Sequence, residues 1–150
     1  NDDEVKEASE GSSIQVILNQ TPFYAESGGQ IGDAGKLEWQ GGYALVSTTQ
    51  KSKQGLFLHT AKVMRGTLKQ GANVHAVVDP SRVETQKHHS ATHLLHAALR
   101  STLGTHVAQA GSLVAPDRLR FDFSHGGAVS VEEIEKIETM VNRWIQADFT

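Results

Sequence analysis

The chain has 150 residues, enough for one ordinary domain or two small ones packed together. Its composition, 38% hydrophobic and 21% charged with three prolines, favours a folded protein over a disordered one, and no apolar run approaches the roughly 18 residues of a membrane-spanning helix. The absence of cysteine excludes a disulfide framework and any thiolate nucleophile or metal ligand supplied by these residues.

The net charge of −3 is unevenly distributed along the chain. Residues 36–100 carry nine Lys or Arg against three acidic residues, whereas residues 1–35 carry one Lys against seven acidic residues. A basic middle region would attract a phosphate backbone, and the acidic start would repel it. The same unevenness is compatible with chance variation in composition, so charge alone leaves a nucleic-acid partner open.

The first half of the chain predicts a β-rich unit. Residues 1–12 are expected to form a flexible lead-in, because the first ten residues include five acids and few apolar side chains. Residues 13–20 alternate apolar and polar side chains, with Ile14, Val16 and Leu18 facing inward as in a half-buried strand. Further β-rich runs follow at residues 43–49, 56–63 and 72–79. We therefore expect residues 13–80 to form a small antiparallel β-barrel.

The second half predicts helices and strands. After Asp79 the apolar period changes from two to about 3.6, which predicts a helix. Ser81 and Glu84 have the spacing of a capping box, and the helix should run to Leu103 and end at Gly104.

Two short strands, residues 112–114 and 118–123, should follow this helix. A second capping box, Ser130 with Glu133, then predicts another helix. Its buried stripe should comprise Ile134, Ile137, Val141 and Trp144. The whole pattern favours an α+β protein. Residues 81–150 would be the N-terminal part of an α/β sandwich, left incomplete by truncation at the C-terminus.

Three histidines fall on one side of the first predicted helix. At about 100° per residue, His89, His93 and His96 cluster opposite the main apolar stripe and face either solvent or a cleft. His89 and His93 are four residues apart, a spacing at which two imidazoles can bind one Zn²⁺. Ser90 stands where a metalloprotease has its glutamate, and a hydrolytic zinc site needs a third protein ligand. Spacing alone therefore leaves metal-binding, exposed and buried hydrogen-bonded histidines as open alternatives.

The other histidines are expected at structural or surface positions. His88 lies outside the cluster and should be on the surface. The rest are scattered singly along the chain: His59, His75, His106 and His125.

Residues 26–35, ESGGQIGDAG, are rich in glycine but contain no phosphate-binding motif. The two glycines before Gln30 would let the backbone approach a neighbour closely, and the Gln30 amide offers a donor and an acceptor. Glu26 and Asp33 could act as an acid or a base, although isolated carboxylates in a polar loop are usually solvated. From these residues alone, a structural turn at a barrel edge is the simpler interpretation.

Two segments together resemble the editing region of alanyl-tRNA synthetase. The first is TPFYAESGGQIGDAG, beginning at Thr21, and the second is HSATHLLHAALRSTLGTHVAQAGSLVAPDRLRFDFSH, beginning at His89. Free-standing alanyl-tRNA editing proteins share the histidine motif. The resemblance runs from about residue 13 to the end, with both segments in the same order.

This resemblance implies a cytoplasmic, zinc-dependent hydrolase that removes serine or glycine wrongly attached to tRNA(Ala). His89 and His93 would be zinc ligands, with the others supplied by a later C-x-x-x-H. Gln30 would line the editing pocket beside the metal, where Gln30 or Thr21 would recognise the substrate. Gly29 would belong to the amino-acid pocket, and the segment QAGSLV, residues 109–114 with Ser112, would form one of its walls. The parent enzyme would attach alanine to tRNA(Ala) with ATP, and the implied fold is a small β-barrel joined to an α/β unit.

The chain departs from this pattern because it contains no cysteine and ends before the expected C-x-x-x-H. We expect an inactive fragment with half a metal site and weak or no zinc binding. One alternative is a tRNA-binding or structural module without catalysis or metal. Another is a metalloprotein whose missing ligand comes from a partner chain. A sheet edge exposed by truncation would favour a homo-oligomer.

Overall fold

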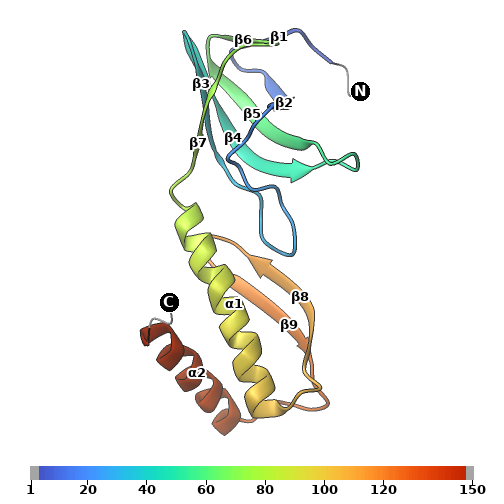
Figure 1. Ribbon diagram of the computed structural model, residues 1–150, viewed down its shortest axis with the longest axis vertical. Coiled ribbons are helices and arrows are strands. Elements are labelled where there is room, and N and C mark those ends of the chain that lie inside the picture. The colour runs from blue at the N-terminus through green and yellow to red at the C-terminus, as the bar shows by residue number, and fades with distance from the viewer. Residues whose placement is uncertain (1–3, 148–150) are drawn as a thin grey trace. The chain divides into compact units, whose positions relative to one another are not determined.

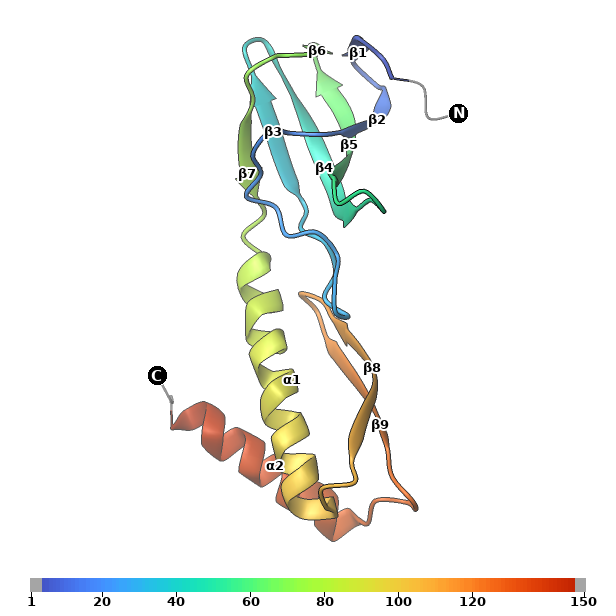
Figure 2. The same cartoon turned by 45° about the vertical axis from the view of Figure 1, so that its right-hand side comes forward.

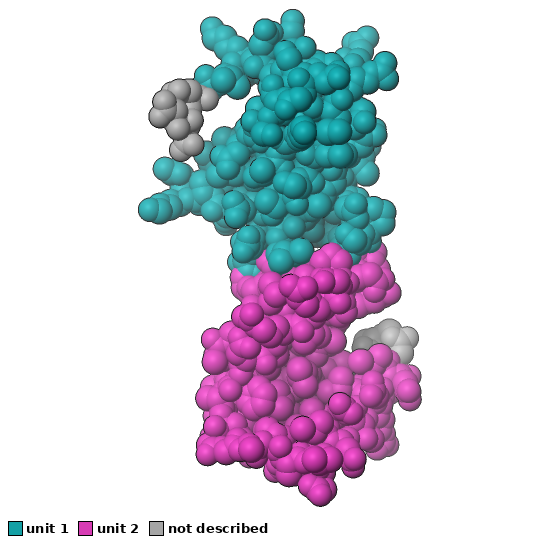
Figure 3. Space-filling model, turned by 180° about the vertical axis from the view of Figure 1, so that it is seen from behind, with its two compact units in different colours: residues 1–27, 31–82 teal, residues 28–30, 83–150 magenta. Residues whose placement is uncertain are grey.

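The computed structural model describes residues 4–147 and combines β-sheets with two helices, in agreement with the predicted α+β class (Figure 1). The chain divides into two compact units (Figure 3). Residues 1–27 and 31–82 form the first unit, and residues 28–30 and 83–150 form the second. Within the described residues, every helix is too short or too polar to cross a lipid bilayer.

The first unit is built from antiparallel strands. A five-stranded sheet has the order β2-β5-β4-β3-β7, and β1 pairs with β6 in a separate ladder. The strands are β1 (Glu7–Ser9), β2 (Ser13–Val16), β3 (Gly35–Trp39), β4 (Gly42–Lys51), β5 (Phe57–Arg65), β6 (Thr67–Lys69) and β7 (His75–Val78).

One face of the five-stranded sheet carries the hydrophobic core of this unit. The buried core residues are Phe23, Leu37, Ala44, Val46 and Ala61. Ile14, Val16 and Leu18 pack against them, as their alternation predicts, although β2 itself ends at Val16.

The predicted closed barrel is not found among the described residues. The two edges of the sheet are β2 and β7, and no strand pairing joins them. Both edge strands are only four residues long, so each offers few backbone groups for closing the sheet. The sheet of the first unit is therefore open.

Part of the expected lead-in is a strand. Ala8 in β1 is buried, and β1 pairs with β6 so that Glu7 lies opposite Lys69. This cross-strand pair of opposite charges is favourable and compensates for the acidic composition that suggested a loose segment. Residues 1–3 of the expected lead-in lie outside the described residues.

The second unit contains two helices and a hairpin. The elements are α1 (Arg82–Leu103), β8 (Ala108–Val114), β9 (Leu119–Ser124) and α2 (Val131–Gln146). Figure 2 shows the β8–β9 hairpin beside α1. The core joins Ala98 and Leu99 of α1, Val107, and Ile137 of α2, with Phe121 and Phe123 of β9 packed against them.

The first helix begins differently from the prediction. The Asp79 carboxylate accepts the Ser81 N–H at 2.8 Å, and the Asp79 carbonyl accepts the Arg82 N–H at 3.1 Å. Hydrogen bonding from Ser81 also lowers the pKa of Asp79. Glu84 instead pairs with Lys87 at 2.7 Å. The predicted Ser81–Glu84 capping box was wrong because the Asp79 side chain binds the local backbone first.

Two other helix signals are confirmed. Gly104 follows the last residue of α1 with φ of +118°, and its N–H donates to the Arg100 carbonyl at 3.1 Å. At the start of α2, the Ser130 and Glu133 side chains each accept the other residue's backbone N–H, which completes the predicted capping box. Of the predicted apolar stripe, Ile137, Val141 and Trp144 join the core, whereas Ile134 is 45% exposed.

Candidate active site

A glycine turn holds Gln30 against β8 of the second unit. Gly28 and Gly29 have φ of +59° and +86°, a region that favours glycine. A Cβ on Gly29 would lie 2.5 Å from the Ser112 carbonyl oxygen, so the close approach requires glycine. The Val114 N–H donates to the Gly29 carbonyl at 2.8 Å, and Gln30 forms a parallel bridge with Val114. The turn is therefore fixed to β8 by backbone contacts.

The Gln30 side chain holds one of the candidate metal ligands. Gln30 is 6% exposed, and its Oε1 lies 2.8 Å from His89 Nδ1. An amide oxygen can only accept, so Nδ1 carries the proton in this pair. In the neutral ring, Nε2 then keeps its lone pair. Histidines that bind metals are commonly oriented by such a bond at the other ring nitrogen.

His93 lies beside His89 on the same face of α1. The two ring centroids are 5.1 Å apart and the rings are tilted by 49°. Both rings line a pocket of about 50 Å³ between α1 and the β8–β9 hairpin. Its other lining residues are Gly28, Thr92, His96, Gln109, Ser112, Val114 and Phe121. The histidine face therefore looks into a polar pocket within the second unit.

The structure brings together five of the six residues singled out from the sequence: His89, His93, Gln30, Gly29 and Ser112. Thr21 is separate, because it belongs to the first unit. Its hydroxyl lies 2.7 Å from His59 Nε2 and accepts the Phe23 N–H at 3.1 Å. Thr21 is not among the residues that line the pocket.

His59 is the buried counterpart of the histidine rings at the pocket. It has no exposed surface, and its Nδ1 donates to the Val16 carbonyl at 2.8 Å. Nε2 is therefore the acceptor of the Thr21 hydroxyl proton. Burial lowers the pKa of His59, while the hydrogen bond to Val16 opposes this shift.

Two expectations about polar residues change, and two other histidines prove to be neighbours. The Asp33 side chain is 4% exposed; it accepts the Tyr24 N–H at 2.8 Å and pairs with Arg82 at 3.2 Å. It therefore fastens its loop instead of being solvated. His88 was expected on the surface, but it is half-buried and its Nδ1 donates to the Ala115 carbonyl at 2.7 Å. His106 and His125, each expected at a structural or surface position, lie together, with ring nitrogens 2.9 Å apart.

One polar residue of the pocket, Thr92, was missed by sequence reasoning, whereas Gln109 lies in the segment that the resemblance placed at the pocket. Thr92 lies one turn from His89 on α1, so helical spacing alone could have found it. Gln109 is three residues from Ser112, which in a regular strand would put the two side chains on opposite faces. An irregularity in β8 between Gln109 and Gly111 shifts the register and places both residues at the pocket.

The described residues lack a complete set of ligands for a zinc ion. No group of three or more His, Asp or Glu side chains is arranged to hold a metal among residues 4–147. His89 and His93 fit two positions of a tetrahedral site, since Gln30 leaves one His89 nitrogen available and the rings are neighbours. Any complete four-ligand site must take its other donors from elsewhere.

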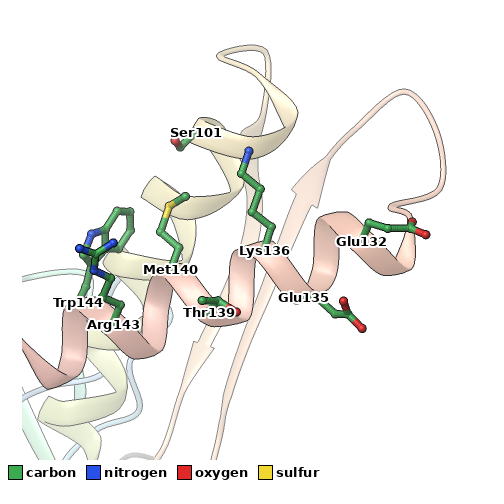
Figure 4. Close-up of a pocket in the computed structure, with 8 residues that line it drawn as sticks. All are labelled: Ser101, Glu132, Glu135, Lys136, Thr139, Met140, Arg143 and Trp144. Atoms are coloured by element: carbon green, nitrogen blue, oxygen red, sulfur yellow. The ribbon is translucent and has the colours of Figure 1, made fainter.

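A second and larger pocket, of about 590 Å³, lies along α2. Figure 4 shows that its lining side chains come from α2, with Ser101 contributed by α1. Charges of both signs, Glu132, Glu135, Lys136 and Arg143, surround it, and no histidine lines it. Despite its smaller volume, the histidine pocket is the better candidate because reactive and hydrogen-bonding side chains converge there.

The chain is similar to tRNA synthetases. Residues 1–82 match the family described as tRNA synthetases class II (A). Over 148 residues, 99% of the chain, it is 61% identical to an alanine–tRNA ligase of Thermus thermophilus. It is 59% identical over 139 residues (93% of the chain) to that of Deinococcus radiodurans, and 53% identical over 145 residues (96%) to that of Thermotoga maritima. The matched segments span only 16–17% of these relatives' length.

Proposed function

The chain belongs to the family of class II (A) tRNA synthetases, and from that premise we propose that it is part of the editing region of an alanine–tRNA ligase. The complete protein would attach alanine to tRNA(Ala) with ATP, and this region would hydrolyse seryl- and glycyl-tRNA(Ala). The observation that carries the proposal is the pair His89 and His93 in a polar pocket, with His89 oriented by the buried Gln30.

We propose that His89 and His93 are two ligands of a zinc ion. The remaining ligands would come from outside the described residues, since residues 4–147 supply no third one. When bound, zinc would supply a Lewis acid beside the pocket. Gln30 would act as a positioning residue, because its buried amide fixes the proton on His89 Nδ1 and thereby directs Nε2 outward.

The polar lining of the pocket suits an editing role. A synthetic site for alanine rejects serine weakly, because the two amino acids differ by one hydroxyl and little volume. A second site that hydrogen-bonds this hydroxyl provides the missing selectivity. We propose that Gln109 and Ser112, both at the pocket, make such contacts, with Gly29 keeping the Ser112 backbone in place. The Thr21 hydroxyl already has a partner, because it is bonded to His59. A substrate role for Thr21 remains a prediction.

The proposed partner is the acceptor end of tRNA(Ala) carrying serine or glycine, in the cytoplasm. A second candidate function is a tRNA-binding or structural module without metal or catalysis. The observation that favours it is that no group of three or more His, Asp or Glu side chains within residues 4–147 could hold a metal. Self-association of the chain remains a prediction, and light scattering tests it.

Metal content and deacylation together test the proposal. In an alanine–tRNA ligase that carries this segment, His89→Ala and His93→Ala should each remove bound zinc and abolish seryl-tRNA(Ala) hydrolysis. Gln30→Ala should lower zinc affinity by roughly 10–100-fold, as expected for a group that orients a ligand. His75→Ala is the matched control, because His75 is exposed in β7 and does not line the pocket. Full zinc content and full hydrolysis in the His89 and His93 variants would favour the second candidate function.

A further inference from the structure

The outer face of the five-stranded sheet in the first unit is exposed. One row of paired residues crosses all five strands on this face: Ser13, Lys62, Leu45, Lys36 and Val77. Lys62 is exposed, and Leu45 and Val77 are 46% and 40% exposed. The opposite face of the same strands carries the buried core. The row is therefore a solvent-facing surface of a sheet whose other side is already packed.

This face is basic. Lys36 and Lys62 are two strands apart in the row, and the exposed Arg65 lies opposite Tyr43 at the end of the β4–β5 pairing. Glu38 is the acidic residue among the paired positions of the outer face, so three cations meet one carboxylate. The charge of the face thus has the sign that a polyanion requires.

One of these cations is held in place. Lys36 Nζ lies 4.7 Å from the centroid of the Tyr43 ring and forms an ion pair with Glu38. The hydrogen bond from Lys36 to the Glu38 side chain lowers the pKa of Glu38, which keeps the carboxylate ionised. Lys62 and Arg65 make no ion pair among the described residues. Lys62 and Arg65 are therefore the cations available to an incoming anionic group.

We propose that this outer face binds the sugar–phosphate backbone of RNA, with Lys62 and Arg65 as phosphate contacts and Leu45 and Val77 packing against the sugars. The inference rests on the proposed function, which makes tRNA the RNA in question. Exposed sheets with basic and apolar side chains are a common platform for RNA. A second copy of the chain would meet the same cations and be repelled by them, so charge favours RNA over self-association.

Salt-dependent binding of an uncharged tRNA(Ala) transcript tests the inference. Fluorescence anisotropy between about 50 and 200 mM salt gives the affinity and its salt slope for the wild-type chain. Lys62→Ala and Arg65→Ala should each reduce the slope by roughly one, and the double variant should bind roughly tenfold more weakly at the lowest salt. Lys136→Ala is the matched control, since it removes one exposed cation from α2 in the second unit.

The outcomes separate the two proposals. Wild-type affinity and slope in the double variant, or an equal loss in Lys136→Ala, would overturn the RNA surface. The RNA surface would also be overturned if the wild-type chain sediments as a dimer and the Leu45→Glu variant as a monomer. That result would show that the outer face binds a second copy of the chain. If sheet variants of an alanine–tRNA ligase that carries this segment lose tRNA binding, while the unsubstituted ligase shows neither zinc binding nor deacylation, the proposed function alone is contradicted.

Discussion

Two histidines, one in each unit, donate a similar hydrogen bond from Nδ1 but have different surroundings on the other side of the ring. His59 Nδ1 donates to the Val16 carbonyl, and His89 Nδ1 donates to the Gln30 amide oxygen, both at 2.8 Å. The second nitrogen of His59 is bonded to Thr21 inside a fully buried environment. The ring of His89 instead lines a pocket beside His93. A histidine becomes available for chemistry when its environment fixes one nitrogen and leaves the other open.

The largest difference should appear in stability. His59→Ala would leave a cavity in place of a buried ring and remove the partner of both Val16 and Thr21. We expect the free energy of unfolding of the first unit to fall by about 3 kcal/mol, comparable to other large-to-small core changes. His89→Ala should change the unfolding free energy by less than about 1 kcal/mol, because that ring is at a pocket. Urea unfolding of both variants checks the comparison. Equal losses of unfolding free energy in the two variants would contradict the expected difference.

Gly29→Ala should disturb the turn that positions Gln30 against His89, while both histidines stay unchanged in sequence. The substitution puts a Cβ at a positive φ and against the Ser112 carbonyl. A cost of about 2 kcal/mol is expected in the second unit, from backbone strain and steric overlap. Gly28→Ala is the matched control, since a Cβ there would meet no atom within 4 Å although its φ is also positive. Calorimetry of the two variants separates overlap from strain, and equal melting temperatures would show that the close approach to Ser112 is unimportant.

The pH dependence of stability sharpens the contrast further. The folded-state pKa of His59 is lowered by burial, so the unfolded chain binds more protons as pH falls below the unfolded value of about 6.5. The contribution of neutral His59 is therefore fully present above that pH and decreases as pH falls towards the folded pKa. We expect a slope of at most about 1.4 kcal/mol per pH unit. Urea unfolding of wild type and His59→Gln between about pH 7.5 and 5.5 measures it, and identical slopes would contradict this role.

The smallest expected effect comes from Thr21. Thr21→Val keeps the side-chain shape but removes the hydroxyl that donates to His59 Nε2. A loss of about 1 kcal/mol is expected in the first unit, because a buried acceptor is left without its partner. Thr21→Ser restores the hydroxyl and should recover most of that loss. A change in seryl-tRNA(Ala) hydrolysis with unchanged stability would instead return Thr21 to the catalytic site.

The sequence predicted features that depend on local spacing. The alignment of His89 with His93, the capping box at Ser130 and the helix end at Gly104 all follow from positions a few residues apart. The resemblance correctly indicated the synthetase family. Strand β3 was missed although Leu37 and Trp39 alternate before a glycine turn, because the segment is only five residues long and follows a glycine-rich loop.

Features that depend on distant pairing could not be predicted from local spacing alone. The bond between Gln30 and His89 joins residues 59 positions apart, and the register irregularity in β8 is invisible in its sequence. The closed barrel was expected from strand content alone, whereas closure depends on which edge strands pair.

The glycine turn at residues 28–30 affects how the two units can be expressed as separate fragments. These three residues belong to the second unit, although the chain on both sides of them belongs to the first. A piece that starts at residue 83 would keep both helices and the hairpin but lose the amide that orients His89. A fragment that reproduces the second unit would therefore have to include residues 28–30 as well, for example through circular permutation, so that Gln30 still orients the His89 ring.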